Sequence, residues 1–300
     1  MKKQAKIVLI IFLLGLTLMT NSFGQKTYPP EIKSSKVETY KSIDSVDLKL
    51  WIFNPEDHKI SDNRAVVVFF FGGGWKGGSP SQFVHQCEYL SERGMVAITA
   101  DYRVATRNDV KANKCVTDAK SAVRWIREHA DELGIDPDRI AAGGGSAGGH
   151  IAAATGTLTG FEEVSEDMSI SSIPDAMVLF NPALILAPLK GNNNLNTERL
   201  KGLEERLGVS PISLSPYHHI SKNIPPTIIF HGRDDTTVPF NTVELFEEEM
   251  KSKGNRCELN AYEGASHGFF NYGRNDNKFY PLTMEKLDAF FVSLKYLDPR

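Results

Sequence analysis

Continuous apolar runs recur along the chain, and segments whose apolar residues follow a helical spacing lie between them. Such runs are typical of strands that are buried on both faces of a parallel sheet. The predicted strands span 65–71, 95–104, 136–144, 176–184, 227–235 and the start of 257–268. The predicted helices span 116–133, 147–158, 242–254 and about 283–297. Two further runs, KVETYKSI at 36–43 and VDLKLWIF at 46–53, predict two strands joined by a short turn.

The alternation of strands and helices predicts an α/β fold with a mostly parallel central sheet flanked by helices. The opening pair of strands is expected to form an antiparallel edge. One segment, 184–223, interrupts the alternation after the sixth predicted strand. Long insertions in compact domains are often lids, so we expect a small lid-like insertion here, with a short helix near 197–207. No linker separates a second domain, and residues 25–300 are predicted to form one domain.

The first 24 residues follow a different pattern. Lys2, Lys3 and Lys6 accompany an apolar run at 7–19, and the polar, small-residue stretch TNSFG follows. This order predicts a secretory signal peptide over 1–24, cleaved near Gly24–Gln25, and a mature protein that is secreted or periplasmic without a stable membrane anchor. The apolar run is short for a bilayer span, although an uncleaved N-terminal anchor is the alternative.

Charge and cysteine content exclude several classes of protein. The chain has 300 residues and a formal net charge of −3, so it lacks the basic footprint of a nucleic-acid-binding protein. Its three widely spaced cysteines form neither a disulfide framework nor a zinc motif, and no metal site is predicted. We expect three buried free thiols, with a single Cys87–Cys115 bridge as the alternative.

A glycine-rich stretch, AAGGGSAGGH at 141–150, places Gly144, Ser146 and Gly148 between a predicted strand and a predicted helix. The pattern G-x-S-x-G in this context forms a strained turn that exposes the serine hydroxyl at the top of the sheet. Side chains at 144 and 148 are expected to clash with the turn and with the next strand. Ser146 is therefore a candidate nucleophile, and a structural turn with an incidental serine is the alternative.

A serine hydroxyl reacts only when a base removes its proton, and the base is held by a carboxylate. The segment EGASHGF follows the last predicted strand and offers His267 as the base. HGRDDTTVP at 231–239 follows another strand and offers Asp234 and Asp235. We choose Asp235 as the acid. The order serine, acid, histidine along the chain is the order found in α/β-hydrolases.

The third strand ends in FFFGGGWKGG, a second glycine-rich stretch. Backbone N–H groups approach a developing oxyanion closely only where side chains are absent, so we assign the oxyanion hole to Gly73, Gly74 and Ala147. A phosphate-binding loop is the alternative, but the stretch lacks the spacing and the ending of such loops. Trp75 is predicted either to contact the substrate's acyl group or to be a core residue.

Other polar residues near these motifs are given structural roles. His150, one helical turn after Ser146, is expected to be a packing residue. His231 is expected to support the loop of the acid. Asp101 and Arg103 follow a buried strand and are expected to form a structural ion pair or hydrogen bonds.

Taken together, these segments resemble the exported α/β-hydrolase carboxylesterases related to hormone-sensitive lipase and to bacterial acetyl and feruloyl esterases. The matching segments are FGGGW at 71–75, DYR at 101–103, 122–150 with its AGGGSAGGH ending, HGRDDTTVP at 231–239 and SHGF at 266–269. The resemblance implies an α/β-hydrolase fold with Ser146, Asp235 and His267 as its catalytic residues. Phe71 replaces the usual histidine of the HGGG motif. The large N-terminal helical cap of the lipase-like members is also missing, which implies a more open cleft.

The resemblance implies a serine esterase that needs no cofactor. We expect it to act on short acyl groups, such as acetyl, on an oligo- or polysaccharide such as xylan. A feruloyl esterase and a general aryl or alkyl carboxylesterase are the alternatives. An exopeptidase or a non-catalytic binding protein on the same fold is a weaker alternative, because the former usually carries an additional large domain and the latter has usually lost its catalytic residues.

Overall fold

The computed structural model describes residues 28–34, 36–189 and 202–300. The chain divides into two units, Met1–Glu31 and Ile32–Arg300, and the second unit contains all the elements described below. The predicted signal peptide at 1–24 and its cleavage position lie outside the described residues, as does the part of the predicted lid at 190–201. Within the described ranges, the helices lack the length and apolar character that crossing a membrane requires.

An eight-stranded sheet forms the centre of the second unit, with the strand order β1-β2-β4-β3-β5-β6-β7-β8. The strands are β1 Lys36–Ile43, β2 Val46–Phe53, β3 Arg64–Phe70, β4 Val96–Ala100, β5 Ile135–Gly145, β6 Ala176–Phe180, β7 Thr227–Gly232 and β8 Cys257–Tyr262. β1 and β2 pair antiparallel, β2 also pairs antiparallel with β4, and the pairs from β4 through β8 are parallel. The predicted mostly parallel sheet with an antiparallel edge is confirmed.

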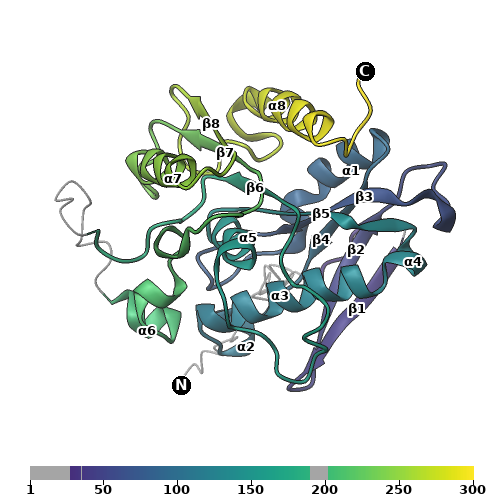
Figure 1. The fold of residues 1–300 in the computed structure, drawn as a ribbon, viewed down its shortest axis with the longest axis horizontal. Helices are drawn as coiled ribbons and strands as arrows, with labels where there is room; N and C mark the ends of the chain where they lie inside the picture. The colour runs from purple at the N-terminus through teal and green to yellow at the C-terminus, as the bar shows by residue number, and fades with distance from the viewer. Residues whose placement is uncertain (1–27, 35, 190–201) are drawn as a thin grey trace, which may run out of the picture. The chain divides into compact units, whose positions relative to one another are not determined.

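Helices cover both faces of this sheet because its central strands are apolar on both sides. The larger helices are α1 Val84–Glu92, α3 Ala112–Glu128, α5 Ala147–Thr157, α7 Asn241–Ser252 and α8 Tyr280–Ser293. In β3, Val66 and Val68 belong to one hydrophobic core with α3, α5 and α7, whereas Val67 and Phe69 belong to another with α1 and α8. Figure 1 shows α3 and α5 in front of the sheet. The three-layer arrangement is that of the α/β-hydrolase fold, which confirms the predicted fold class.

The boundaries of several elements differ from the predicted ones. The helix predicted at 116–133 begins earlier and divides into α3 and α4, Ala130–Leu133. β4 and β6 end before the apolar residues Tyr102, Val104 and Leu184, which are buried in loops. Helix α1 has no counterpart among the predicted elements, because its sequence VHQCEYLSE shows little apolar periodicity. The buried loop residues Tyr102, Val104 and Leu184 show that an apolar, buried residue need not belong to a strand.

The three cysteines are buried free thiols, as expected. Cys87 on α1 packs in one hydrophobic core and Cys115 on α3 packs in the other, so the sheet separates them. The alternative of a Cys87–Cys115 bridge is therefore wrong.

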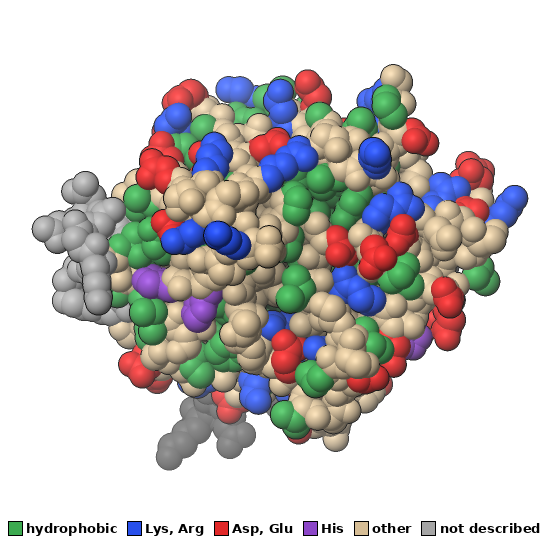
Figure 2. Space-filling view, viewed as in Figure 1, with side chains coloured by type: hydrophobic (Ala, Val, Ile, Leu, Met, Phe, Trp, Pro, Cys, Tyr) green, Lys and Arg blue, Asp and Glu red, His purple; other side chains and the backbone are tan. Residues whose placement is uncertain are grey.

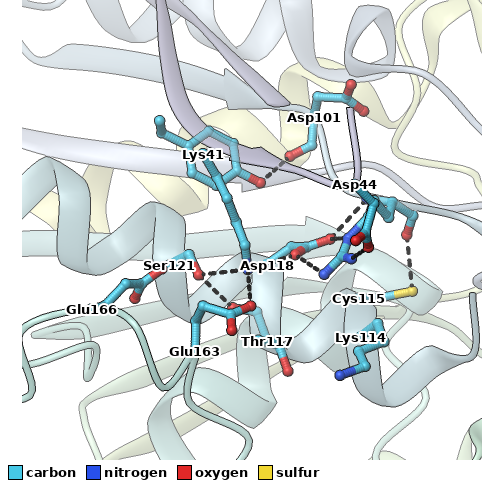
Figure 3. A network of polar contacts seen from close by, with 12 residues as sticks. Lys41, Asp44, Asp101, Lys114, Cys115, Thr117, Asp118, Ser121, Glu163 and Glu166 are labelled. Atoms are coloured by element: carbon cyan, nitrogen blue, oxygen red, sulfur yellow. Dashed lines mark hydrogen bonds and ion pairs between the residues drawn. The ribbon is translucent and has the colours of Figure 1, made fainter. Parts of the chain in front are cut away.

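A buried ionic network joins the antiparallel edge of the sheet to α3 (Figure 3). Asp118 on α3 accepts hydrogen bonds from Arg103 Nε at 2.9 Å and Nη2 at 2.8 Å, and it lies 2.9 Å from Lys41 Nζ on β1. Lys41 also pairs with Glu163 at 3.0 Å and donates to Ser121 Oγ at 3.0 Å. These side chains come from four separate parts of the sequence, so the network cross-links elements that the backbone does not connect.

The expected structural role of Asp101 and Arg103 is met with different partners. Arg103 pairs with Asp118, whereas Asp101 accepts from the backbone N–H of Tyr102 at 2.8 Å and lies 3.4 Å from Arg107. On the outside, lysine and arginine side chains are intermixed with aspartate and glutamate over the face shown in Figure 2. Charges of opposite sign are therefore neighbours on this face.

Replacing Asp118 with alanine is expected to lower the free energy of unfolding by about 3–5 kcal/mol, because two buried cations, Lys41 and Arg103, lose their shared carboxylate. Glu38→Ala is the matched control. It breaks the exposed Lys36–Glu38 pair, whose side chains are 45% and 32% accessible, and it should cost less than about 1 kcal/mol. Urea unfolding of both variants measures the difference, and equal losses would contradict the importance of this network.

Candidate active site

The turn that carries Ser146 connects the end of β5 to the start of α5. Ser146 has φ 55° and ψ −117°, a strained backbone held by a 2.9 Å hydrogen bond from its N–H to the carbonyl of Phe180. A Cβ at position 148 would lie 2.0 Å from the Phe70 carbonyl oxygen, and one at 144 would lie 2.4 Å from the Gly148 carbonyl oxygen. The clashes expected at these two glycines are therefore real, and they explain why only glycine fits.

The structure brings Ser146, His267 and Asp235 together in one chain of hydrogen bonds. His267 Nδ1 lies 2.7 Å from Asp235 Oδ2, and His267 Nε2 lies 2.9 Å from Ser146 Oγ. Asp235 follows β7 and His267 follows β8, so parallel neighbours deliver both side chains to the edge of the sheet where β5 ends. Asp235 accepts from histidine, which leaves Nε2 free to accept the proton of the serine hydroxyl.

Asp235 is the buried member of the Asp234–Asp235 pair and Asp234 is exposed. Its Oδ1 accepts from the backbone N–H groups of Thr237 and Val238, both at 2.8 Å. Burial raises the pKa of Asp235, but the hydrogen bonds from His267 and Val238 outweigh burial, and its pKa lies below the usual value. Asp235 is therefore an ionised carboxylate aimed at the imidazole.

His231 lies beneath this loop, as expected for a supporting residue. It is fully buried, its Nε2 donates to the Val238 carbonyl at 2.9 Å, and the same nitrogen lies 3.4 Å from Asp235 Oδ2. Burial lowers the pKa of His231, so it is a neutral donor that fixes the turn around Asp235.

The loop after β3 carries two of the predicted oxyanion donors, Gly73 and Gly74, and the third, Ala147, is the first residue of α5. The N–H of Gly72 donates to Gln82 Oε1 at 2.6 Å, whereas no acceptor for the N–H groups of Gly73, Gly74 or Ala147 lies among the described residues. The Cα of Gly72 faces the serine, since a Cβ there would lie 3.3 Å from Ser146 Cβ. This loop therefore borders the serine and offers unpaired donors.

Phe71, which replaces the histidine that the resemblance leads one to expect, is held in place by apolar packing. Its ring stacks on Tyr102 with centroids 4.1 Å apart, and Arg107 lies 5.6 Å from the ring centroid. The Tyr102 hydroxyl donates to the Phe71 carbonyl at 2.6 Å. The loop is thus anchored through the ring and the backbone of Phe71 without a histidine.

Three amide side chains that the sequence did not single out hold the loop of His267, and two of them, Gln82 and Asn271, connect it to the oxyanion loop. Gln82 Nε2 donates to Asn271 Oδ1 at 3.0 Å, and Asn271 Nδ2 donates to the Gly268 carbonyl at 2.7 Å. The N–H of Gly268 in turn donates to Asn181 Oδ1 at 3.0 Å. No local pattern marks these residues, because each acts on a segment far away in the sequence.

His150 does more than the packing expected of it. Trp75 Nε1 donates to His150 Nδ1 at 3.1 Å, and His150 Nε2 lies 2.8 Å from the Leu214 carbonyl. Since an indole nitrogen only donates, Nδ1 is the unprotonated nitrogen and Nε2 carries the hydrogen. Burial lowers the pKa of His150 to about 4, although the hydrogen bond to Leu214 opposes this. A neutral imidazole therefore joins the oxyanion loop, α5 and the insertion.

Trp75 is 5% exposed and its indole N–H is occupied by His150. Such low exposure agrees with a core residue, which is one of the two roles expected for Trp75. The other role, a contact with the acyl group, stays a prediction. Within the described ranges, no three His, Cys, Asp or Glu side chains are grouped so that they could hold a metal ion.

His150→Gln is expected to reduce the pH dependence of stability, because glutamine keeps a donor and an acceptor but does not ionise. With a folded pKa of about 4 and an unfolded value of about 6.5, the unfolded state binds the proton first as pH falls. The wild type should lose about 2 kcal/mol more unfolding free energy than the variant between pH 7.5 and pH 5. Urea unfolding at both pH values measures this, and identical losses would refute it.

Curated relatives match this chain at 28% and 29% identity over part of their length. A "Probable carboxylic ester hydrolase LipM" of Mycobacterium tuberculosis is 28% identical over 67% of this chain and 48% of the relative. A "Probable isoprenylcysteine alpha-carbonyl methylesterase ICMEL1" of Arabidopsis thaliana is 29% identical over 68% of this chain and 45% of the relative. The chain thus spans about half the length of these curated relatives.

Solved structures match over nearly the whole length of both chains. Thermogutta terrifontis esterase 2 phosphonylated by sarin is 54% identical, covers 91% of this chain and 100% of its own, and has a TM-score of 0.87. The butyrate-bound form of this thermophilic esterase is 53% identical, with coverage of 92% and 100% and a TM-score of 0.87. The BD-FAE family model matches residues 50–250, which include Ser146 and Asp235. This chain therefore belongs to the BD-FAE family of α/β-hydrolases, whose relatives and structural neighbours named here are carboxylic ester hydrolases.

Proposed function

We propose that this protein is a carboxylic ester hydrolase in which Ser146 is the nucleophile, His267 the general base and Asp235 the acid that holds it. One observation carries the proposal: Asp235, His267 and Ser146 are linked by hydrogen bonds of 2.7 and 2.9 Å, beside N–H groups of Gly73, Gly74 and Ala147 for which no described residue is an acceptor. The similarity to carboxylic ester hydrolases and esterases supports it.

In the first half of the reaction, Ser146 Oγ attacks the ester carbonyl carbon while His267 Nε2 takes the hydroxyl proton. The carbonyl oxygen becomes an oxyanion, which the N–H groups of Gly73, Gly74 and Ala147 stabilise. Each such donor contributes about 10²–10³ in kcat. When the tetrahedral intermediate collapses, the alcohol leaves with the proton from His267 and the acyl group remains on Ser146.

In the second half, water attacks the acyl-enzyme and gives its proton to His267. The second tetrahedral intermediate collapses, the carboxylic acid leaves, and His267 returns the proton to Ser146. Asp235 stays ionised throughout, in keeping with its lowered pKa. It holds the imidazole with Nε2 toward the serine and stabilises the imidazolium that forms in each half.

The substrate we propose carries a short acyl group on an oligo- or polysaccharide, with acetylated xylan as the example. Structures of the Thermogutta terrifontis esterase bound to propionate and to butyrate support a short acyl group. The carbohydrate and the export of the protein rest on sequence resemblance and on the signal-peptide pattern at 1–24. The family also admits feruloyl and general aryl or alkyl esters, which stay as alternatives.

Ser146→Ala is expected to lower the hydrolysis of p-nitrophenyl acetate by at least about 10⁴-fold, because it removes the hydroxyl that lies 2.9 Å from His267 Nε2. Circular dichroism and the melting temperature should show an intact fold. Paraoxon, which phosphorylates the Thermogutta terrifontis esterase, should add one mass adduct to the wild type and none to the variant. Wild-type turnover by the variant would refute the mechanism.

On natural esters, acetate release from acetylated xylan is expected to exceed ferulate release from feruloylated arabinoxylan by about tenfold or more at equal ester concentration. The reason is that the Thermogutta terrifontis esterase binds propionate and butyrate, which are short carboxylates. Liquid chromatography of the released acids measures both rates, with Ser146→Ala as the blank. Faster release of ferulate than of acetate would contradict the proposed acetyl substrate and favour the feruloyl esterase alternative.

A further inference from the structure

Arg206 reaches the oxyanion loop from the insertion. It lies in the short helix α6, Leu203–Leu207, and its Nε donates to the Gly74 carbonyl at 3.0 Å, with Nη2 donating to the same oxygen. Its Cζ lies 5.0 Å from the ring centroid of Trp75. A Cβ at Gly74 would lie 2.3 Å from Nη2, so the absence of a side chain at 74 makes room for the guanidinium.

The charge of Arg206 has no carboxylate beside it within the described part of the chain. Other buried or half-buried arginines are paired: Arg93 with Asp288, Arg103 with Asp118, and Arg124 with Glu162 and Glu166. For Arg206, burial is the one cause of a pKa shift, and it lowers the pKa. An unpaired charge is costly to desolvate, so a carboxylate from outside the described chain would be a favourable partner.

The hydrogen bonds of Arg206 leave one edge of the guanidinium open. The Nε–Nη2 edge is occupied by the Gly74 carbonyl, whereas no described residue accepts from Nη1 or from the second hydrogen of Nη2. These two nitrogens form the fork that binds a carboxylate in bidentate fashion. The open edge therefore matches a carboxylate in shape as well as in charge.

The position of this edge connects it to the reaction. Gly74 is one of the three proposed oxyanion donors, and the same loop borders Ser146 through Gly72. The guanidinium therefore contacts the carbonyl of the same residue, Gly74, whose N–H is proposed to receive the ester carbonyl oxygen.

We infer that Arg206 is a specificity-determining residue that binds a carboxylate of the ester substrate. The inference rests on the proposed function, which it narrows to esters that also carry a carboxylate. The carboxylate belongs either to the acyl group, as in a half-ester of a dicarboxylic acid, or to the alcohol, as in an acetylated uronic acid. Both sources present the same group to the fork, and the test separates them.

The test compares the wild type and Arg206→Met on two matched pairs of esters. The acyl pair is p-nitrophenyl hemisuccinate and p-nitrophenyl butyrate, and the alcohol pair is acetylated galacturonic acid and its methyl ester. The variant should lose about tenfold or more in kcat/KM for the charged member of one pair, mainly through KM, and less than about threefold for the neutral members. The pair that responds identifies which part of the substrate carries the carboxylate.

Arg256→Met is the matched control, because Arg256 also lies over an aromatic ring, Phe290, but pairs with Glu258 at 2.6 Å. Arg256→Met should leave the ratio of kcat/KM for the charged ester to kcat/KM for the neutral ester unchanged in both pairs. Arg206→Lys keeps the charge and loses the fork, so it should retain part of the preference. Inhibition of the wild type by succinate should be stronger than inhibition by butyrate when the carboxylate belongs to the acyl group, and this readout needs no variant.

Equal losses on charged and neutral esters in Arg206→Met would overturn the inference and assign Arg206 to holding the Gly74 carbonyl. Equal inhibition by succinate and butyrate would overturn the acyl source, and the alcohol pair then decides the inference. A wild type that hydrolyses none of these esters, charged or neutral, would instead contradict the proposed function. The two failures are therefore distinguishable.

Discussion

The candidate site depends on how closely the start of α5 approaches the end of β3. Gly148 packs against the Phe70 carbonyl at a distance that no side chain permits, and this contact fixes the turn on which Ser146 adopts its positive φ. The hydrogen bond from Ser146 to Phe180 ties the same turn to β6. With the turn held from both sides, the hydroxyl has a defined position, and the other groups of the site are built around it.

The remaining groups come from loops at one edge of a parallel sheet. Parallel strands place their carboxyl ends together, so the segments after β3, β5, β7 and β8 meet although they are far apart in sequence. Amide side chains then fix these loops to each other: Gln82 and Asn271 join the oxyanion loop to the segment of His267, and Asn181 holds Gly268 from beneath. Such cross-links limit the motion that would separate the histidine from the serine.

The insertion after β6 contributes to the site through two contacts of different kinds. The Leu214 carbonyl reaches Trp75 through His150, which is buried and neutral, and Arg206 reaches Gly74 directly with a charged group. In the first contact, both ring nitrogens of His150 are hydrogen-bonded, and the contact stabilises the loop. In the second contact, Nη1 of Arg206 and the guanidinium charge have no partner among the described residues, which is the reason to assign Arg206 a role in recognition.

The sequence by itself determined the order and type of most elements and the chemistry of the site, because both depend on local patterns. Apolar runs, helical spacing and the glycines around Ser146 act over a few residues, and Asp235 and His267 follow strands that can be recognised without coordinates. Tertiary structure decided the partners. These partners depend on which distant segments meet. Arg103 pairs with Asp118, His150 bridges Trp75 to Leu214, and Arg206 lies on Gly74. No local pattern encodes those meetings, since they follow from the packing of the whole sheet.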